Sequence, residues 1–304
     1  MRRFAPYTIE YDNIPQAHRI MRTHYTQDGI NWQVRYLVLP EEKDHWSYQH
    51  YGVHTFRVDK DYYIGYLHAY HCANQQIYTE IIYSRDGLNW NRVPNSKPFI
   101  ANGGVGSWSF GMIFTQSAPL ELNGKYYLPL GHVTKHHHYY VTPGKEDVSF
   151  VTADYLKRSF DGRNLTKQWP YFNEIGGWEG LAKDMHNYNA SVGLATFRKD
   201  AWMVVKAETA GEMLTRVFTA KDNNLQLNAI TAKGGEIKIE VLNADGTPIG
   251  AYCGKNAAVF KGDGTDVLIK WGKGSISSLP DMPFRLRMSM KKAEIYSLNF
   301  VKNK

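Results

Sequence analysis

Histidine is the side chain best suited to proton transfer near neutral pH, and in this sequence its distribution is uneven. All twelve histidines fall between His18 and His186, and the last 118 residues contain none. The unperturbed pKa of histidine lies close to neutrality, and histidine is also the commonest metal ligand in proteins. We therefore expect the chemistry in the first 186 residues, with the remainder of the chain in a supporting role.

Several of these histidines alternate with tyrosines on segments that have the pattern of strands. Alternate residues of a strand share a face, so His50 and His54 are expected on one face and Tyr51 on the other. His68 lies on the next expected strand, residues 62–70. Two adjacent strands would then present His50, His54 and His68 to one cavity.

Histidine and tyrosine together favour elimination from a uronic acid. In this reaction the sugar carboxylate is neutralised, a base removes the C5 proton, and an acid assists the group leaving C4. Histidine and tyrosine can act as base and acid, while histidine, arginine or a metal can offset the carboxylate charge. The candidate catalytic residues for this reaction are His50, Tyr51, His54 and His68.

Hydrolysis of a glycosidic bond would instead require two carboxyl groups. Four candidates stand in the sequence, and we expect Glu80, beside a turn motif, to point outward from its strand. Glu179 and Asp184 fall in residues 176–186, which have the pattern of an irregular loop that would line the mouth of a funnel. The fourth candidate is Asp44.

Further residues have types suited to sugars or metals. Aromatic side chains in loops and at strand starts can stack on sugar faces, and the substrate-binding candidates are Trp46, His71, Arg85, Trp108 and Gln116. His132, His136 and His138 could form a zinc-like site. Residues 136–138 also fit a solvated loop, because consecutive side chains on an extended segment face opposite sides. The sequence requires no cofactor.

The charge pattern restricts the partners. The net charge is +7, but residues 187–304 hold 17 Lys and Arg against 11 Asp and Glu, whereas residues 1–186 hold 19 against 18. Nucleic-acid binding needs a concentrated basic face, so we expect an acidic oligosaccharide and no nucleic acid. No segment approaches the roughly 20 apolar residues of a membrane helix. Residues 1–7 carry positive charge without an apolar core, so no signal peptide is visible. This leaves two expectations open: a periplasmic or secreted protein if a signal peptide has been removed, and otherwise a cytoplasmic one.

The pattern of the whole chain predicts an all-β protein. Alternation dominates, and Asp-Gly, Asn-Gly and Gly-Gly pairs between the expected strands are typical of hairpin turns. The segments TQDGINW (residues 26–32) and SRDGLNW (residues 84–90) match each other, and residues 159–165 hold a degraded third copy. Each follows an expected strand, so each is expected to be a turn. Their recurrence predicts repeated β-sheet blades, hence a propeller.

These motifs carry a resemblance to a known group. The sequence resembles the five-bladed propellers of the glycoside hydrolase 32/43/68-like superfamily. The resemblance lies in residues 84–93, 98–100, 106–108, 111–114, 123–128 and 191–200. The similarity is greatest to a large, mostly uncharacterised branch. In that branch a segment like residues 235–249 belongs to a C-terminal antiparallel β-sandwich. The resemblance therefore implies a propeller over residues 1–196 and a sandwich over residues 197–304.

Two features depart from this resemblance. About 196 residues are few for five blades of roughly 40–45 residues each, so one blade is expected to be incomplete or an N-terminal part absent. Gln116 and Ser109 also stand where the resemblance implies acids. We therefore interpret the protein as an eliminating enzyme, a lyase or dehydratase acting on a uronic-acid-containing oligosaccharide. A two-carboxylate glycoside hydrolase and a non-catalytic glycan-binding protein remain the alternatives.

Overall fold

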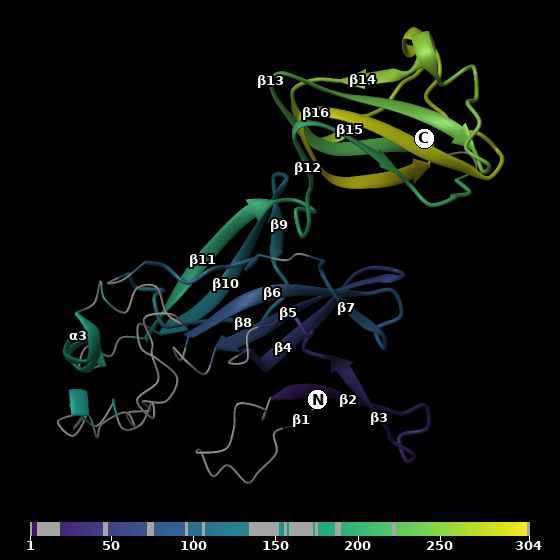
Figure 1. The fold of residues 1–304 in the computed structure, drawn as a ribbon. Coiled ribbons are helices and arrows are strands. Elements are labelled where there is room, and N and C mark those ends of the chain that lie inside the picture. Colours follow the sequence, from purple (N-terminus) through teal and green to yellow (C-terminus); the bar gives the residue numbers. More distant parts are fainter. Residues whose placement is uncertain are drawn as a thin grey trace. The chain divides into compact units, whose positions relative to one another are not determined.

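The computed structural model describes residues 2–4, 19–44, 48–71, 76–94, 97–104, 107–133, 152–154, 157, 173, 176–185, 190–220 and 223–302 (Figure 1). Strands dominate these residues, which confirms the predicted all-β class. The chain divides into two compact units. The N-terminal unit comprises Met1–Leu120 with Tyr127–Thr196, and the C-terminal unit comprises Glu121–Tyr126 with Phe197–Lys304.

Two sheets are formed mainly by the described residues of the N-terminal unit. In the smaller, β1 (Arg2–Phe4), β2 (Ile20–Tyr25) and β3 (Gln33–Val38) pair in that order. The larger has the order β11-β10-β8-β6-β5-β4, with β7 on β6 and β9 on β10. Its strands are β4 (Tyr48–Asp59), β5 (Tyr62–His71), β6 (Gln76–Ser84), β7 (Trp90–Arg92), β8 (Met112–Thr115), β9 (Leu120–Leu122), β10 (Lys125–Val133) and β11 (Ala190–Arg198).

Strands β4 to β7 form a consecutive antiparallel meander within the larger sheet. Strand β8 meets β6 in a single parallel bridge, Ile77 to Met112, and contacts β5 without pairing with it. Apolar side chains join the smaller sheet to the meander, because Met21 and Leu37 pack with Leu67 and Ile82 in one buried cluster. The meander is thereby covered on one face by β2 and β3.

The two matching segments are turns, as the sequence predicts. In SRDGLNW, Oδ1 of Asp86 accepts hydrogen bonds from the backbone N–H of Leu88 (2.8 Å) and of Asn89 (2.7 Å). In TQDGINW, Asp28 accepts from Ile30 and Asn31 at the same two distances. The following glycines have positive φ, 74° and 76°. One turn joins β6 to β7 and the other joins β2 to β3, so each lies between paired antiparallel strands.

The C-terminal unit is a five-stranded sheet of order β12-β16-β13-β14, with β15 also on β13. Its strands are β12 (Val205–Leu214), β13 (Asn223–Asn243), β14 (Ala258–Phe260), β15 (Asp263–Leu268) and β16 (Phe284–Lys302), with 3₁₀ turns η3 (Gly254–Asn256) and η4 (Gly272–Gly274). The pairing of β13 with β16 is irregular between Thr231 and Glu236. A Cβ at Gly235 would lie 2.6 Å from the carbonyl oxygens of Lys291 and Lys292, so this approach of two backbones requires glycine.

One predicted loop is a helix. Residues 176–186 have the pattern of an irregular stretch, but the structure forms α3 (Gly177–Met185) there. Glu179 in its first turn and Lys183 in its last complement the helix dipole, and this explains a helix that apolar periodicity does not reveal. In the part of the chain that the structure describes, no helix has the length and apolar character needed to cross a membrane.

Candidate functional site

Many of the candidate residues gather at one end of the larger sheet. Strand β4 begins at Tyr48, where it pairs with His71 at the end of β5, and β6 begins beside His71. The bridge from Ile77 to Met112 brings the start of β8 to the same end. His132 pairs beside it, near the end of β10. Strands β4, β6 and β8 thus begin, and β5 and β10 end, at the same end of the sheet. The fold therefore brings aromatic and histidine side chains together there.

A β-bulge at Tyr51 changes which histidines share a face. His50 lies opposite Ala69, whereas Gly52 lies opposite His68, so one extra residue stands in β4. Opposed residues of an antiparallel pair share a face and neighbours alternate. His50 is therefore on the opposite face from His68, and the prediction that His50, His54 and His68 face one cavity is wrong for His50.

His54 and His68 do share a face, because His54 lies opposite Tyr66, two residues from His68. The two rings have different surroundings. His54 is half-buried and stacks on Tyr66, with 6.5 Å between ring centres. Burial lowers the pKa of His54 from its ordinary value of 6.5, so its neutral form is favoured.

His68 is buried and fixed by the backbone. The N–H of Thr115 lies 3.1 Å from Nε2 of His68, and the Oγ1 of Thr115 lies 3.2 Å from the same nitrogen. A Cβ at Gly52 would lie 3.1 Å from Nδ1 of His68, so glycine gives the ring its space. These contacts join β4, β5 and β8, and they make His68 a positioning residue.

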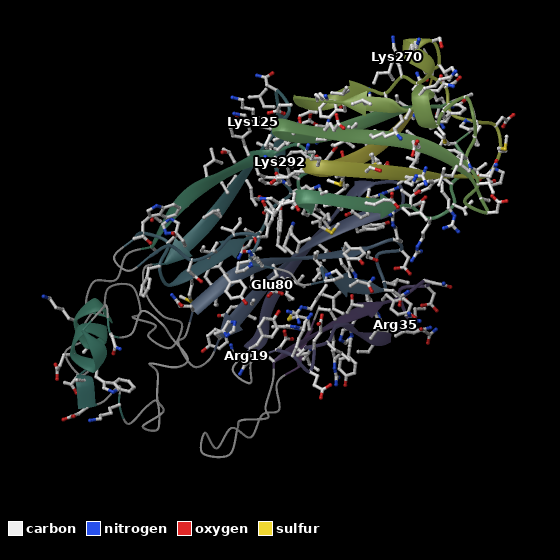
Figure 2. The ribbon with its side chains drawn as sticks, turned by 45° about the horizontal axis from the view of Figure 1, so that its top comes forward. Arg19, Arg35, Glu80, Lys125, Lys270 and Lys292 are labelled. Carbon is white, nitrogen blue, oxygen red and sulfur yellow. The ribbon has the colours of Figure 1, made fainter. Side chains whose placement is uncertain are left out.

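Arg19 is a site residue that the sequence analysis did not single out. Its guanidinium carbon lies 5.5 Å from the ring centre of Tyr51 and 5.2 Å from that of Tyr70. The carbonyl of Arg19 accepts a 2.8 Å hydrogen bond from the N–H of His50, which holds the segment beside β4 (Figure 2). This long-range contact brings the arginine to the tyrosines, and no local pattern around residue 19 indicates it.

The guanidinium of Arg19 shares with that of Arg92 a position over a tyrosine ring and one buried nitrogen without a hydrogen-bond partner among the described residues. Its Nη1 is buried and has no hydrogen-bond partner within the described part of the chain. Arg35, by comparison, lies 5.3 Å from the ring centre of Tyr25, and its Nη1 donates a hydrogen bond to Asn89 (3.4 Å). A desolvated guanidinium nitrogen beside two aromatic rings is suited to binding an anion such as a carboxylate.

The other face at the same end carries a buried ionic cluster. Glu80 is 4% exposed, so the expectation that it points outward is wrong. Its Oε2 accepts hydrogen bonds from Nη2 of Arg92 (3.0 Å) and from the hydroxyl of Tyr48 (2.9 Å), and its Oε1 accepts from Tyr78 (3.3 Å). Nη1 of Arg92 donates to Asp44 at 2.5 Å. Burial has a physical reason here, because a paired and hydrogen-bonded carboxylate loses less on leaving water.

The tyrosines of this cluster are held as phenols. Burial, with the nearby carboxylate of Glu80, raises the pKa of Tyr48 and of Tyr78. His71, predicted to bind substrate, is part of the same cluster, since its Nε2 lies 3.1 Å from the hydroxyl of Tyr78. His50 packs edge to face on Tyr48, with 5.5 Å between ring centres. The cluster therefore links β4, β5, β6 and β7 through polar contacts.

The other predicted residues whose side chains the structure describes are separate from both groups. Glu179 is exposed on α3, which also contains Asp184, while Gln116 is exposed after β8. Arg85 is exposed in the SRDGLNW turn, where it lies over the ring of Tyr62 at 5.1 Å. The side chain of Asp184 lies outside the described part of the structure, as does Trp46 entirely. None of these positions is brought to Arg19 by a contact that the structure describes.

The predicted metal ligands are only partly placed. His132 is 2% exposed, and its Nε2 lies 3.0 Å from the hydroxyl of Ser191. His136 and His138 lie outside the described residues. Among the side chains that the structure does describe, no three or more of His, Cys, Asp and Glu are grouped to hold a metal ion. The zinc-like site stays a prediction.

Comparison with known proteins does not identify a family. No protein-family model matches the sequence, and a comparison with curated proteins also gives no match.

Proposed function

We propose that this protein is a carbohydrate-active enzyme that cleaves a uronic-acid-containing oligosaccharide by β-elimination. The observation that supports this most is the placement of Arg19 against the contacting rings of Tyr51 and Tyr70, with a buried guanidinium nitrogen that has no partner among the described residues. Elimination needs a cation for the sugar carboxylate and a proton-transfer group beside it. Arginine and tyrosine supply these two chemical functions from one small cluster.

In the proposed reaction, Arg19 binds the carboxylate on C5 and stabilises the negative charge that develops there. Tyr51, as its phenolate, takes the C5 proton. The electron pair of the C5–H bond becomes the C4=C5 double bond, and the C4–O4 bond breaks with its electrons going to oxygen. The phenol of Tyr51 returns the proton to that oxygen. His68 positions the neighbouring β8 through Thr115.

The proposed architecture is the five-bladed propeller with a C-terminal β-sandwich, of the glycoside hydrolase 32/43/68-like type. The antiparallel meander β4 to β7 supports it, because a propeller blade is a four-stranded sheet. The two matching turns hold similar places, one before β3, the last strand of the smaller sheet, and the other before β7, the last strand of the meander. The bent strands β13 and β16, closing over one apolar core, support the sandwich.

Hydrolysis is the second candidate, and one observation favours it. Asp44 and Glu80 bind the two terminal nitrogens of one guanidinium, which keeps the carboxylates closer than the roughly 9.5 Å upper limit between catalytic acids. However, Glu80 accepts all three of its described hydrogen bonds. A general acid must donate a proton, so the cluster supports hydrolysis less well than Arg19 and Tyr51 support elimination.

The test uses a panel of uronic-acid polymers, namely polygalacturonate, alginate, hyaluronan and glucuronoxylan. Incubation with the protein should produce the ultraviolet absorbance of a 4,5-unsaturated uronate from one of them. Mass spectrometry should find no added water in the unsaturated product. Reducing ends without that absorbance would establish hydrolysis. Binding to a polymer without any product would establish a non-catalytic glycan-binding protein, and both results would reject elimination.

A further inference from the structure

Trp108 presents one of the larger exposed aromatic surfaces at the end of the sheet where the candidate site lies. Its side chain is 51% exposed, although tryptophan is usually well buried. The indole packs against Gly193 on β11, where an added Cβ would lie 2.4 Å from Cη2 of Trp108. Glycine at residue 193 therefore gives the ring a flat backbone to rest on, and part of the indole stays in solvent.

The loop that carries Trp108 is fixed by its own hydrogen bonds. The N–H of Ser107 donates to Gly104 (3.0 Å), and that of Phe110 donates to Ser107 (3.2 Å). Phe110 is 1% exposed and anchors the loop in the core. A ring on such a loop loses little conformational freedom when a ligand binds, so its contact area is converted to affinity at a low entropic cost.

A polar pair lies beside the indole. The buried ring of His132 has its centre 3.7 Å from that of Trp108, and its Nε2 lies 3.0 Å from Oγ of Ser191. Burial lowers the pKa of His132, and a hydrogen bond to the backbone of Trp108 opposes this effect. Ser191 is exposed, so its hydroxyl is within reach of a ligand on the indole.

We propose that Trp108 is the stacking platform of a sugar subsite, which takes one pyranose ring of the oligosaccharide. The apolar C–H face of the sugar would lie on the indole, and the hydroxyl of Ser191 would bond to a sugar hydroxyl. A large rigid aromatic with a polar group beside it is suited to such amphipathic ligands. This subsite rests on the proposed function, because its ligand is the same oligosaccharide.

The test measures binding of hexasaccharides prepared from the four polymers to the Tyr51→Phe protein, which should not consume them. Titration should quench part of the tryptophan fluorescence. Adding Trp108→Ala should weaken binding roughly ten-fold or more, about 1.4 kcal/mol, and Trp108→Phe should weaken it less. Gly193→Ala should act like Trp108→Ala, because the added methyl displaces the indole. Trp32→Ala, at an indole that is 58% exposed outside this group, is the matched control.

The subsite would be overturned if the Trp108→Ala and Gly193→Ala variants bound with the same affinity as the parent protein. It would also be overturned if the parent bound none of the hexasaccharides. Equal loss in the Trp32→Ala control would overturn it too. The two proposals fail in different ways. Unsaturated product with no effect of Trp108 on affinity or KM rejects the subsite alone. Binding that depends on Trp108, without unsaturated product from the wild-type protein, rejects elimination alone.

Discussion

Arg92 holds Glu80 inside the larger sheet through a 3.0 Å hydrogen bond from Nη2 to Oε2, with both side chains almost fully buried. Removing one partner of a buried ion pair leaves the other charge uncompensated, which costs about 3–5 kcal/mol. We therefore expect Arg92→Met to lower the free energy of unfolding by about that amount in urea titrations. The double variant Glu80→Gln/Arg92→Met should lose less than Arg92→Met alone. A double variant that is less stable than the single one would contradict this account.

The proposed roles of Tyr51 and Arg19 can be distinguished by their different effects on kcat and KM. Tyr51→Phe removes the proton-transfer hydroxyl and should lower kcat by roughly 10²–10⁴-fold. Arg19→Lys keeps the charge but loses the forked geometry that binds a carboxylate, so it should raise KM and lower kcat. Rates of unsaturated-product formation on the cleaved polymer measure both.

Arg35→Ala removes an arginine stacked on Tyr25 away from the group and serves as the control. Its kcat and KM should match those of the wild-type protein. Wild-type kcat in Tyr51→Phe would rule out the proposed base.

The requirement for glycine in the Asp-Gly turns can be tested by substitution. Gly87 has a φ of 74°, which is costly for a residue with a side chain. Gly87→Ala should destabilise the protein by about 1–2 kcal/mol. Gly131→Ala is the matched control, because Gly131 has an ordinary φ and open space at its Cβ. It should be neutral, or stabilising by roughly 0.4–1 kcal/mol. Urea unfolding of both variants measures the difference, and equal losses would reject the conformational explanation.

The lowered pKa of His132 leads us to expect that the folded protein becomes less stable in mild acid. The pKa of His132 in the folded protein is lower than its ordinary value of 6.5, so protons bind first to the unfolded chain as the pH falls below about 6.5. The free energy of unfolding should therefore decrease between about pH 7 and pH 5. His54 contributes with the same sign. The depressed pKa values of Asp28 and Asp86 place their effect at lower pH.

Unfolding of wild type and His132→Gln at about pH 7.5 and pH 5.5 tests this dependence. The decrease should be smaller in the variant, because one of the two histidines no longer titrates. An unchanged decrease would show that His132 is not among the groups responsible.

Local patterns predicted the strands and turns well. Alternation over residues 62–70 predicts β5 nearly to its end, and the Asp-Gly turns of residues 26–32 and 84–90 form as expected. These features depend on a few consecutive residues. The pair Gly234-Gly235 was expected to separate two strands, but it bends one continuous strand, β13. The close backbone of Lys291 and Lys292 determines this outcome, and it is distant in sequence.

The candidate site was less predictable for the same reason. Tyr51 and His68 were identified by type, but the bulge that separates His50 from His68 exists only in the pairing of β4 with β5. Burial of Glu80 depends on Arg92, which sequence alone does not pair with it. Arg19 reaches Tyr51 and Tyr70 only because its carbonyl binds the N–H of His50. Long-range contacts decided each of these points.

The extra residue in β4 lets one strand serve two separate groups. Before the bulge, Tyr48 and His50 belong to the ionic cluster, and Tyr51 packs on Tyr70 in the group of Arg19. Deleting Tyr51 would restore uniform alternation and leave both halves of β4 in their present register, so His50 and His68 would stay on opposite faces while the group of Arg19 would lose its tyrosine. The separation of the groups is thus encoded in the length of a strand as well as in its composition. In a library of variants, deletion of Tyr51 should therefore preserve the pairing of β4 with β5, whereas a one-residue insertion after Gly52 should disturb it.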